Sequence, residues 1–103
     1  PLLDRLPLDK RGALVALSSE DHYTRIRTTR GEELVLLRLA HAIREATPAQ
    51  GLQVHRSHWV ALDQVVAVRR TGARTLLQLS MGDDIPVSRA HIAAIKQAGL
   101  LPL

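Results

Sequence analysis

The residues of this sequence best suited to chemistry are its arginines. Twelve of the 14 basic residues are Arg, against ten acidic residues, and the formal net charge is +4. Nine Arg but only four carboxylates lie between His22 and Arg74, so the positive charge is concentrated in the middle of the chain. A guanidinium presents a planar fork that suits phosphate oxygens and the edge of guanine. This composition favours a nucleic acid partner, although a merely solvated basic surface would give the same counts.

The arginines recur in short clusters with other polar residues. Arg25 and Arg27 are two residues apart and share one face of an expected strand. A later polar stretch is bracketed by the apolar residues Val54 and Trp59, which suits a loop anchored at both ends. It consists of His55, Arg56, Ser57 and His58. The same pattern also fits an ordinary turn in which Arg56 only faces solvent. The remaining clustered residues are Arg69, Arg70, Arg74, Ser88 and Arg89.

Catalytic constellations are absent from the sequence. There is no Cys, no G-x-S-x-G motif, and the six Gly form neither of the usual phosphate-binding motifs. The carboxylate pairs at 32–33 and 83–84 fall in expected turns, where water keeps them ionised. His55 and His58 have H-x-x-H spacing, but in an extended segment their rings would face opposite sides. We therefore expect no enzyme activity, no metal site or other cofactor, and no small-molecule substrate.

The length and composition of the chain indicate the kind of domain that positions these clusters. A chain of 103 residues, 46% hydrophobic and 23% charged, is typical of one globular domain. Only Tyr23 and Trp59 are aromatic, so the chain has few side chains on which the bases of a single-stranded nucleic acid could stack. No stretch approaches the roughly 20 apolar residues of a membrane span, and a chain without Cys suits a reducing compartment, so we expect the cytoplasm. A start at Pro1 rather than Met is typical of a segment cut from a longer protein or trimmed for expression.

The apolar pattern predicts about seven short strands that follow one another as hairpins. Runs rich in Val, Leu and Ile, or alternating with polar residues, are typical of such strands. Because the strands do not alternate with helices, we expect a mainly β fold of small antiparallel sheets with short helices. Seven expected strands span 13–18, 23–28, 33–37, two short segments within 52–62, then 64–70 and 74–80. In residues 85–87, Pro86 argues for an edge position or a strand end.

Two helices and a leader complete the expected chain. The first helix should end before Pro48, and the second should follow Ser88 as its N-cap and stop at Gly99. The apolar residues at helical spacing in the first helix are Leu36, Leu39, Ala40 and Ile43. Residues 1–12 show no settled period and are interpreted as an N-terminal leader that packs on the edge of one domain spanning 13–103.

Three segments, in this order and spacing, resemble the LytTR family of DNA-binding domains. They are Tyr-Thr-Arg-Ile-Arg-Thr at 23–28, Val-His-Arg-Ser-His-Trp-Val at 54–60 and Pro-Val-Ser-Arg at 86–89. The resemblance covers residues 13–98, and its middle segment is the most specific. It implies a single domain of small antiparallel β-sheets of the LytTR type, with helices packed alongside, in a bacterial transcription regulator.

The resemblance also implies how such a domain reads DNA. LytTR-like domains bind paired direct repeats in double-stranded promoter DNA, insert loop residues into successive major grooves and bend the duplex. They are often attached to a response-regulator receiver of a two-component system or to a membrane segment, and we expect two copies to pair on DNA. By position, the implied base-reading residues are His22 or Tyr23, Arg56 and Arg89. Contacts to the DNA backbone are expected from Arg25, Arg27, His55, Ser57, His58, Arg69, Arg70, Arg74 and Ser88.

One departure limits a direct transfer of the family's properties to this chain. Where some members have Asn in the middle segment, this chain has Arg56, which favours guanine over adenine at a base edge.

The alternative function is a protein-interaction module that docks an acidic partner through the same Arg-rich face. A preference for one duplex over a scrambled one that persists at rising salt would separate DNA reading from such docking.

Overall fold

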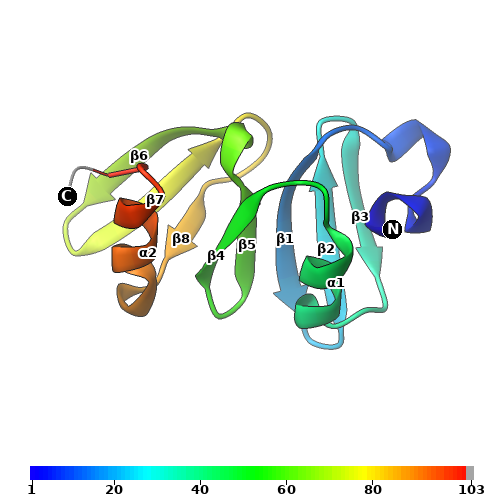
Figure 1. The fold of residues 1–103 in the computed structure, drawn as a ribbon, viewed down its shortest axis with the longest axis horizontal. Helices are drawn as coiled ribbons and strands as arrows, with labels where there is room; N and C mark the ends of the chain where they lie inside the picture. The colour runs from blue at the N-terminus through cyan, green and yellow to red at the C-terminus, as the bar shows by residue number, and fades with distance from the viewer. Residues whose placement is uncertain (102–103) are drawn as a thin grey trace.

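The computed structural model describes residues 1–101 of the chain. They form eight strands, two α-helices and four short 3-10 helices (Figure 1). The strands are β1 (Leu14–Glu20), β2 (Tyr23–Thr28), β3 (Gly31–Val35), β4 (Gly51–His55), β5 (His58–Ala61), β6 (Val65–Thr71), β7 (Arg74–Leu79) and β8 (Ile85–Val87). The α-helices are α1 (Leu39–Glu45) and α2 (Ile92–Gln97), and the 3-10 helices are η1 (Leu2–Arg5), η2 (Leu8–Lys10), η3 (Leu62–Gln64) and η4 (Arg89–His91).

The strands form two antiparallel sheets. The larger sheet has the order β3-β2-β1-β5-β4, and the smaller has the order β6-β7-β8. Every pair of neighbours in both sheets is antiparallel. The mainly β fold with small antiparallel sheets and short helices is therefore confirmed. β8 lies at the edge of its sheet, a position that tolerates Pro86.

Strand β1 is buried on both faces at the centre of the larger sheet. Leu14 and Leu17 belong to one hydrophobic core, whereas Val15 and Ala16 belong to a second core. The register shifts between Leu14 and Ala16, and such a bulge lets two consecutive side chains face the same side. The continuous apolar run that predicted a buried strand is thus explained by a core on each side of it.

The first core lies under α1, whose Leu39 and Ala42 are buried against the larger sheet. Leu36 and Ala40, which were expected on the buried face of this helix, are exposed. That prediction was wrong because β3 ends at Val35 and α1 begins only at Leu39, so Leu36 lies in the connecting loop with 67% of its surface exposed.

Residues 1–12 also contribute to the first core. Leu2 and Leu6 are buried in it, with 2% and 3% of their surface exposed. Arg5 donates two hydrogen bonds to the Glu45 carboxylate at the end of α1, each 2.8 Å long. The leader segment is therefore packed on the larger sheet, while the boundary placed between it and the domain stays a prediction.

The second core joins the two sheets. Val54 and Val60 of the larger sheet pack with Leu77 and Ile85 of the smaller sheet and with Ile95 of α2. The result is an elongated molecule of 38 × 24 × 23 Å, in which the smaller sheet with α2 and the larger sheet with α1 lie at opposite ends (Figure 1). The shared core fixes how loops of the two sheets stand relative to each other.

Candidate nucleic-acid interface

Three loops that are distant in sequence meet along one edge of the molecule. The β1–β2 turn, the β4–β5 turn and the junction of β8 with η4 all lie at the lower edge in Figure 1. The backbone N–H of Ser19 donates to Ser57 O at 2.8 Å, and the N–H of Ser88 donates to Val54 O at 3.0 Å. These bonds tie the first and third loops to the β4–β5 hairpin between them. We call residues 21–23, 56–57 and 88–91 the turn edge.

The turn edge contains every residue that was expected to read bases. His22, Arg56 and Arg89 are exposed, and Tyr23 has 42% of its surface exposed. Within residues 1–101, the arginines held in ion pairs are Arg5, Arg11, Arg25, Arg27 and Arg69. Arg56 and Arg89 thus lie on the same edge with side chains open to solvent and with no carboxylate partner among the described residues.

The β4–β5 turn is held in shape by several hydrogen bonds. His55 Nδ1 accepts the backbone N–H of Ser57 at 3.1 Å, and Gln53 Nε2 donates to Arg56 O at 3.4 Å. The anchors that precede and follow the polar stretch are buried: Val54 is fully enclosed and Trp59 is 4% exposed. The chain therefore presents Arg56 at the tip of a turn whose ends are fixed.

The two histidines of this hairpin lie side by side. His55 is paired with His58 across the turn, and their ring centroids are 5.1 Å apart. The expectation that the rings face opposite sides was wrong, because the chain reverses at residues 56–57 instead of continuing extended. His58 Nδ1 lies 2.8 Å from Ser18 Oγ. Burial, followed by the proximity of His55 and Arg27, lowers the pKa of His58.

Arg27 has a structural position that does not suit the expected phosphate contact. Only 8% of the residue is exposed, and Nη1 donates to Met81 O at 3.1 Å and to Asp83 O at 2.9 Å in the β7–β8 loop. Its Nε lies 3.2 Å from Glu32 Oε2 without making a hydrogen bond. Gly82 has φ +78°, and a side chain there would come within 2.9 Å of the guanidinium. Arg27 therefore clamps the smaller sheet to the larger one, and we remove it from the expected DNA contacts.

Arg25 and Arg69 are held by carboxylates. Arg25 Nε donates to Glu20 Oε2 at 2.5 Å, and Arg25 Nη1 lies 3.6 Å from Glu32 Oε1. The hydrogen bond from Arg25 lowers the pKa of Glu20. Arg69 donates to Asp84 across the outer face of the smaller sheet. Both side chains remain partly exposed, so a phosphate would compete with a carboxylate that is already in place.

The β6–β7 hairpin and the start of the final helix carry the remaining expected contacts. Arg70 and Arg74 are exposed at the tip of the hairpin. Ser88 precedes η4 but makes no side-chain cap hydrogen bond; its Oγ lies 2.5 Å from His91 Nδ1 instead. The expected Ser88 cap of the final helix is therefore wrong, because η4 intervenes and His91 takes the N-cap position of α2.

One exposed cation near the turn edge was not singled out from the sequence. Arg38 is the N-cap residue of α1 and is exposed, and Figure 1 shows the β3–α1 loop at the same lower edge. Because the expected helix included Arg38, the sequence did not indicate that this residue lies at the end of the β3–α1 loop. The signal that pointed to it was only the excess of Arg in the middle of the chain.

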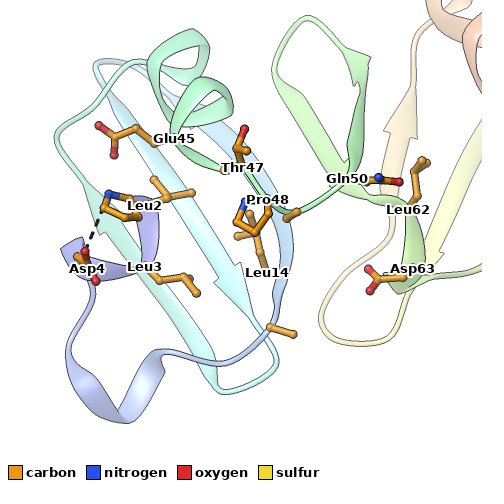
Figure 2. A pocket seen from close by; sticks show the side chains of 14 residues that line it. Leu2, Leu3, Asp4, Leu14, Glu45, Thr47, Pro48, Gln50, Leu62 and Asp63 are labelled. Atoms are coloured by element: carbon orange, nitrogen blue, oxygen red, sulfur yellow. Dashed lines mark ion pairs between the residues drawn. The ribbon is translucent and has the colours of Figure 1, made fainter.

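A cavity of about 780 Å³ lies at the other end of β1 from the turn edge. Figure 2 shows Leu2, Leu14, Pro48 and Leu62 around it, from η1, the start of β1, the loop after α1 and η3. Its lining is mostly apolar and contributes no residue to the turn edge.

The described part of the chain lacks two further kinds of site. Among residues 1–101, no group of three or more His, Cys, Asp or Glu side chains is placed to hold a metal ion. None of the helices found there combines the length and apolar character that crossing a bilayer requires.

Comparison with known proteins identifies relatives of this chain. Residues 11–99 match the LytTr DNA-binding domain family. Over 92 residues the chain is 35% identical to the CO-responsive transcriptional regulator RcoM of Rhodospirillum rubrum, covering 87% of this chain but only 38% of that protein. The fold matches that of the LytTr DNA-binding domain of a response regulator from Bacillus cereus with a TM-score of 0.72, at 20% identity, covering 88% of this chain and 83% of that one. The chain belongs to the LytTR family of DNA-binding domains.

Proposed function

We propose that this domain binds double-stranded DNA in a sequence-specific way, as the output domain of a bacterial transcription regulator, through its turn edge. The observation that carries the proposal is that Arg56 and Arg89 come from different sheets' loops and yet lie on one edge, tied together by the Ser19–Ser57 and Ser88–Val54 hydrogen bonds. An edge with unpaired guanidinium groups suits the negative duplex.

The direction in which the turn edge runs supports contact with more than one groove. Its longest extent is 38 Å, and the turn edge runs along that axis in Figure 1. One turn of B-DNA advances about 34 Å, so successive major grooves on one face of a duplex are about that far apart. The turn edge takes up only part of that axis in Figure 1, so we propose that exposed side chains at its two ends reach towards neighbouring grooves of a bent duplex, with the β4–β5 turn between them.

The exposed residues suggest a division of roles. Arg56 and Arg89 are proposed to donate bidentate hydrogen bonds to guanine, and His22 or Tyr23 to make the contact nearest the β1–β2 turn. Of the arginines expected to contact the DNA backbone, Arg70 and Arg74 are exposed and have no ion pair among the described residues, so they are proposed as the main phosphate contacts. Arg25 and Arg69 remain proposals that require a phosphate to displace a carboxylate. Ser57, His58 and Ser88 lie at or beside the turn edge and stay in the proposed set.

Partners beyond the duplex are also proposed. RcoM is described as a transcriptional regulator, and this chain spans 38% of its length. We infer a parent protein in which a receiver or a membrane segment controls this domain, and promoter DNA with paired direct repeats on which two copies lie. Such a role requires that the domain face the cytoplasm.

Selection from a randomised duplex pool tests the proposed function. The chain should enrich one sequence, and its preference for that duplex over a scrambled duplex should persist from 50 to 200 mM salt while overall affinity falls. Failure to enrich any sequence, together with tight binding to an acidic protein surface, would instead support docking of an acidic partner.

A further inference from the structure

We propose that His55 is a positioning residue for Arg56: its ring accepts the Ser57 N–H and so fixes the turn from which Arg56 reaches DNA. This inference rests on the proposed function and moves His55 out of the residues expected to contact the DNA backbone. It needs no contact between His55 and the duplex.

The geometry of the bond is that of a side chain capping its own turn. His55 Nδ1 lies 3.1 Å from the backbone N of Ser57, two residues further along the chain. Asn and Asp commonly make this i to i+2 bond through a side-chain oxygen, and it holds the chain in a turn. A ring nitrogen accepts only when it carries no proton, so the neutral ring of His55 must carry its proton on Nε2.

The rest of the hairpin supports the same turn. Gln53 donates to Arg56 O, and Ser57 O accepts from Ser19. The ring of His58 packs at 5.1 Å from that of His55 and is held by Ser18. The carbonyl of Arg56 and both backbone groups of Ser57 are therefore engaged, while the Arg56 side chain stays exposed. Ordering a loop before it binds lowers the entropy lost on association.

Amide exchange in the free protein tests the turn without DNA. We expect the Ser57 N–H of the full 103-residue chain to be protected at pH 7.5, and His55→Ala to lower its protection about three- to tenfold, the loss of one hydrogen bond. His55→Asn should restore protection, because Oδ1 can accept the same N–H. His41→Gln, which removes a ring that lies 3.0 Å from Glu45, is the matched control and should leave Ser57 unchanged.

Binding measurements then test the link to Arg56. The probes are the duplex enriched by the wild-type chain and a scrambled duplex of equal length, each at pH 7.5. The preference for the enriched duplex should fall about three- to tenfold in His55→Ala and recover in His55→Asn. Unfolding curves for each variant show whether the fold is intact.

The two proposals fail in different ways. If the wild type prefers no duplex, the proposed function is wrong, and the exchange of Ser57 still decides whether His55 holds the turn. If the wild type is selective but His55→Ala keeps both its selectivity and its Ser57 protection, the positioning role of His55 is overturned. If His55→Asn behaves as His55→Ala does, His55 acts through its size or charge, which also contradicts the proposal.

Discussion

Arginine has opposite roles in strand β2 and at the turn edge. In β2, Arg27 is 8% exposed and donates to two carbonyls of the β7–β8 loop, and the nearby Arg25 is paired with Glu20 and Glu32. At the turn edge, Arg56 and Arg89 are exposed and form no ion pair with the described residues. The same residue type stabilises the fold in one region and remains available for a partner in the other.

Strand pairing explains the difference. A side chain in the middle of a sheet has neighbours on adjacent strands, and β3 supplies Glu32 opposite Arg27. A side chain at the tip of a turn has no residue opposite it on a neighbouring strand. In the β4–β5 turn, the carbonyl of residue 56 and both backbone groups of residue 57 are already hydrogen-bonded to Gln53, His55 and Ser19. An unpaired charge therefore costs the fold little at the turn edge, where water solvates it.

Removing the clamp between the sheets should have the largest effect. Arg27→Met deletes two hydrogen bonds from a buried charged group and is expected to lower the free energy of unfolding by about 2 to 4 kcal/mol. Chemical denaturation measures this, with Arg30→Met as the matched control. Arg30 is exposed at the β2–β3 turn, so its replacement should change stability by less than about 0.5 kcal/mol. Equal effects of the two substitutions would remove the contrast between the regions.

Substitutions at the turn edge should show the reverse pattern. Arg56→Ala and Arg89→Ala are each expected to cost about 1 to 3 kcal/mol in binding to the enriched duplex and little on a scrambled one. Their unfolding free energies should stay within about 0.5 kcal/mol of the wild type, because neither side chain contacts a carboxylate. Titrations on both duplexes measure the split. Equal losses on the two duplexes would place these arginines on phosphates instead of bases.

The β6–β7 hairpin sharpens the comparison between free and paired arginines. Arg70→Ala and Arg74→Ala should weaken binding to all duplexes alike and reduce the slope of log affinity against log salt by about 0.9 each. Arg69→Ala is the matched variant on the same hairpin. It should reduce the slope less, because Asp84 already neutralises Arg69. An unchanged slope for Arg70 and Arg74 would remove this hairpin from the interface.

The smallest effect is expected for a paired arginine at the surface. Hydrogen bonds from Arg5 lower the pKa of Glu45 to about 2, from an ordinary value of 4.5. Because the folded-state pKa is lowered, this pair stabilises the fold above pH 4.5, and its contribution is lost as the pH falls towards 2. Arg5→Met should therefore flatten the acid limb of the stability curve while changing little in DNA binding. Parallel stability curves for the two proteins between pH 5 and 2 would contradict this.

The sequence was most informative about the strands. β2 was predicted at residues 23–28 and an edge position or strand end at 85–87, and both match the structure, because alternation and short apolar runs are local signals. The first helix shows the limit: Leu36 fits the helical spacing but belongs to a loop, since β3 and not the spacing decides where the helix begins. Periodicity reports a preference, and tertiary packing decides the boundary.

The candidate site was predictable to a different degree at each residue. Arg56 could be singled out because it lies in a polar stretch between two apolar anchors, and Arg89 because it follows Ser88 in the Pro-Val-Ser-Arg segment of the resemblance. The partners of Arg25, Arg27 and Arg69 could not, because Glu20, Asp84 and the Met81 carbonyl meet them only through strand pairing and loop packing. The close pair of tilted rings at His55 and His58 depends in the same way on where the chain reverses.

Mapping the contact surface tests the central claim most directly. Amide chemical shifts of the chain should be followed by NMR while the enriched duplex is added. The turn edge is predicted to show the largest changes, at residues 21–23, 56–57 and 88–91 together, with little change at Arg27 or around the cavity near Leu14. Changes confined to one of the three loops, or centred on the cavity side of the larger sheet, would contradict a single edge that carries all three contacts.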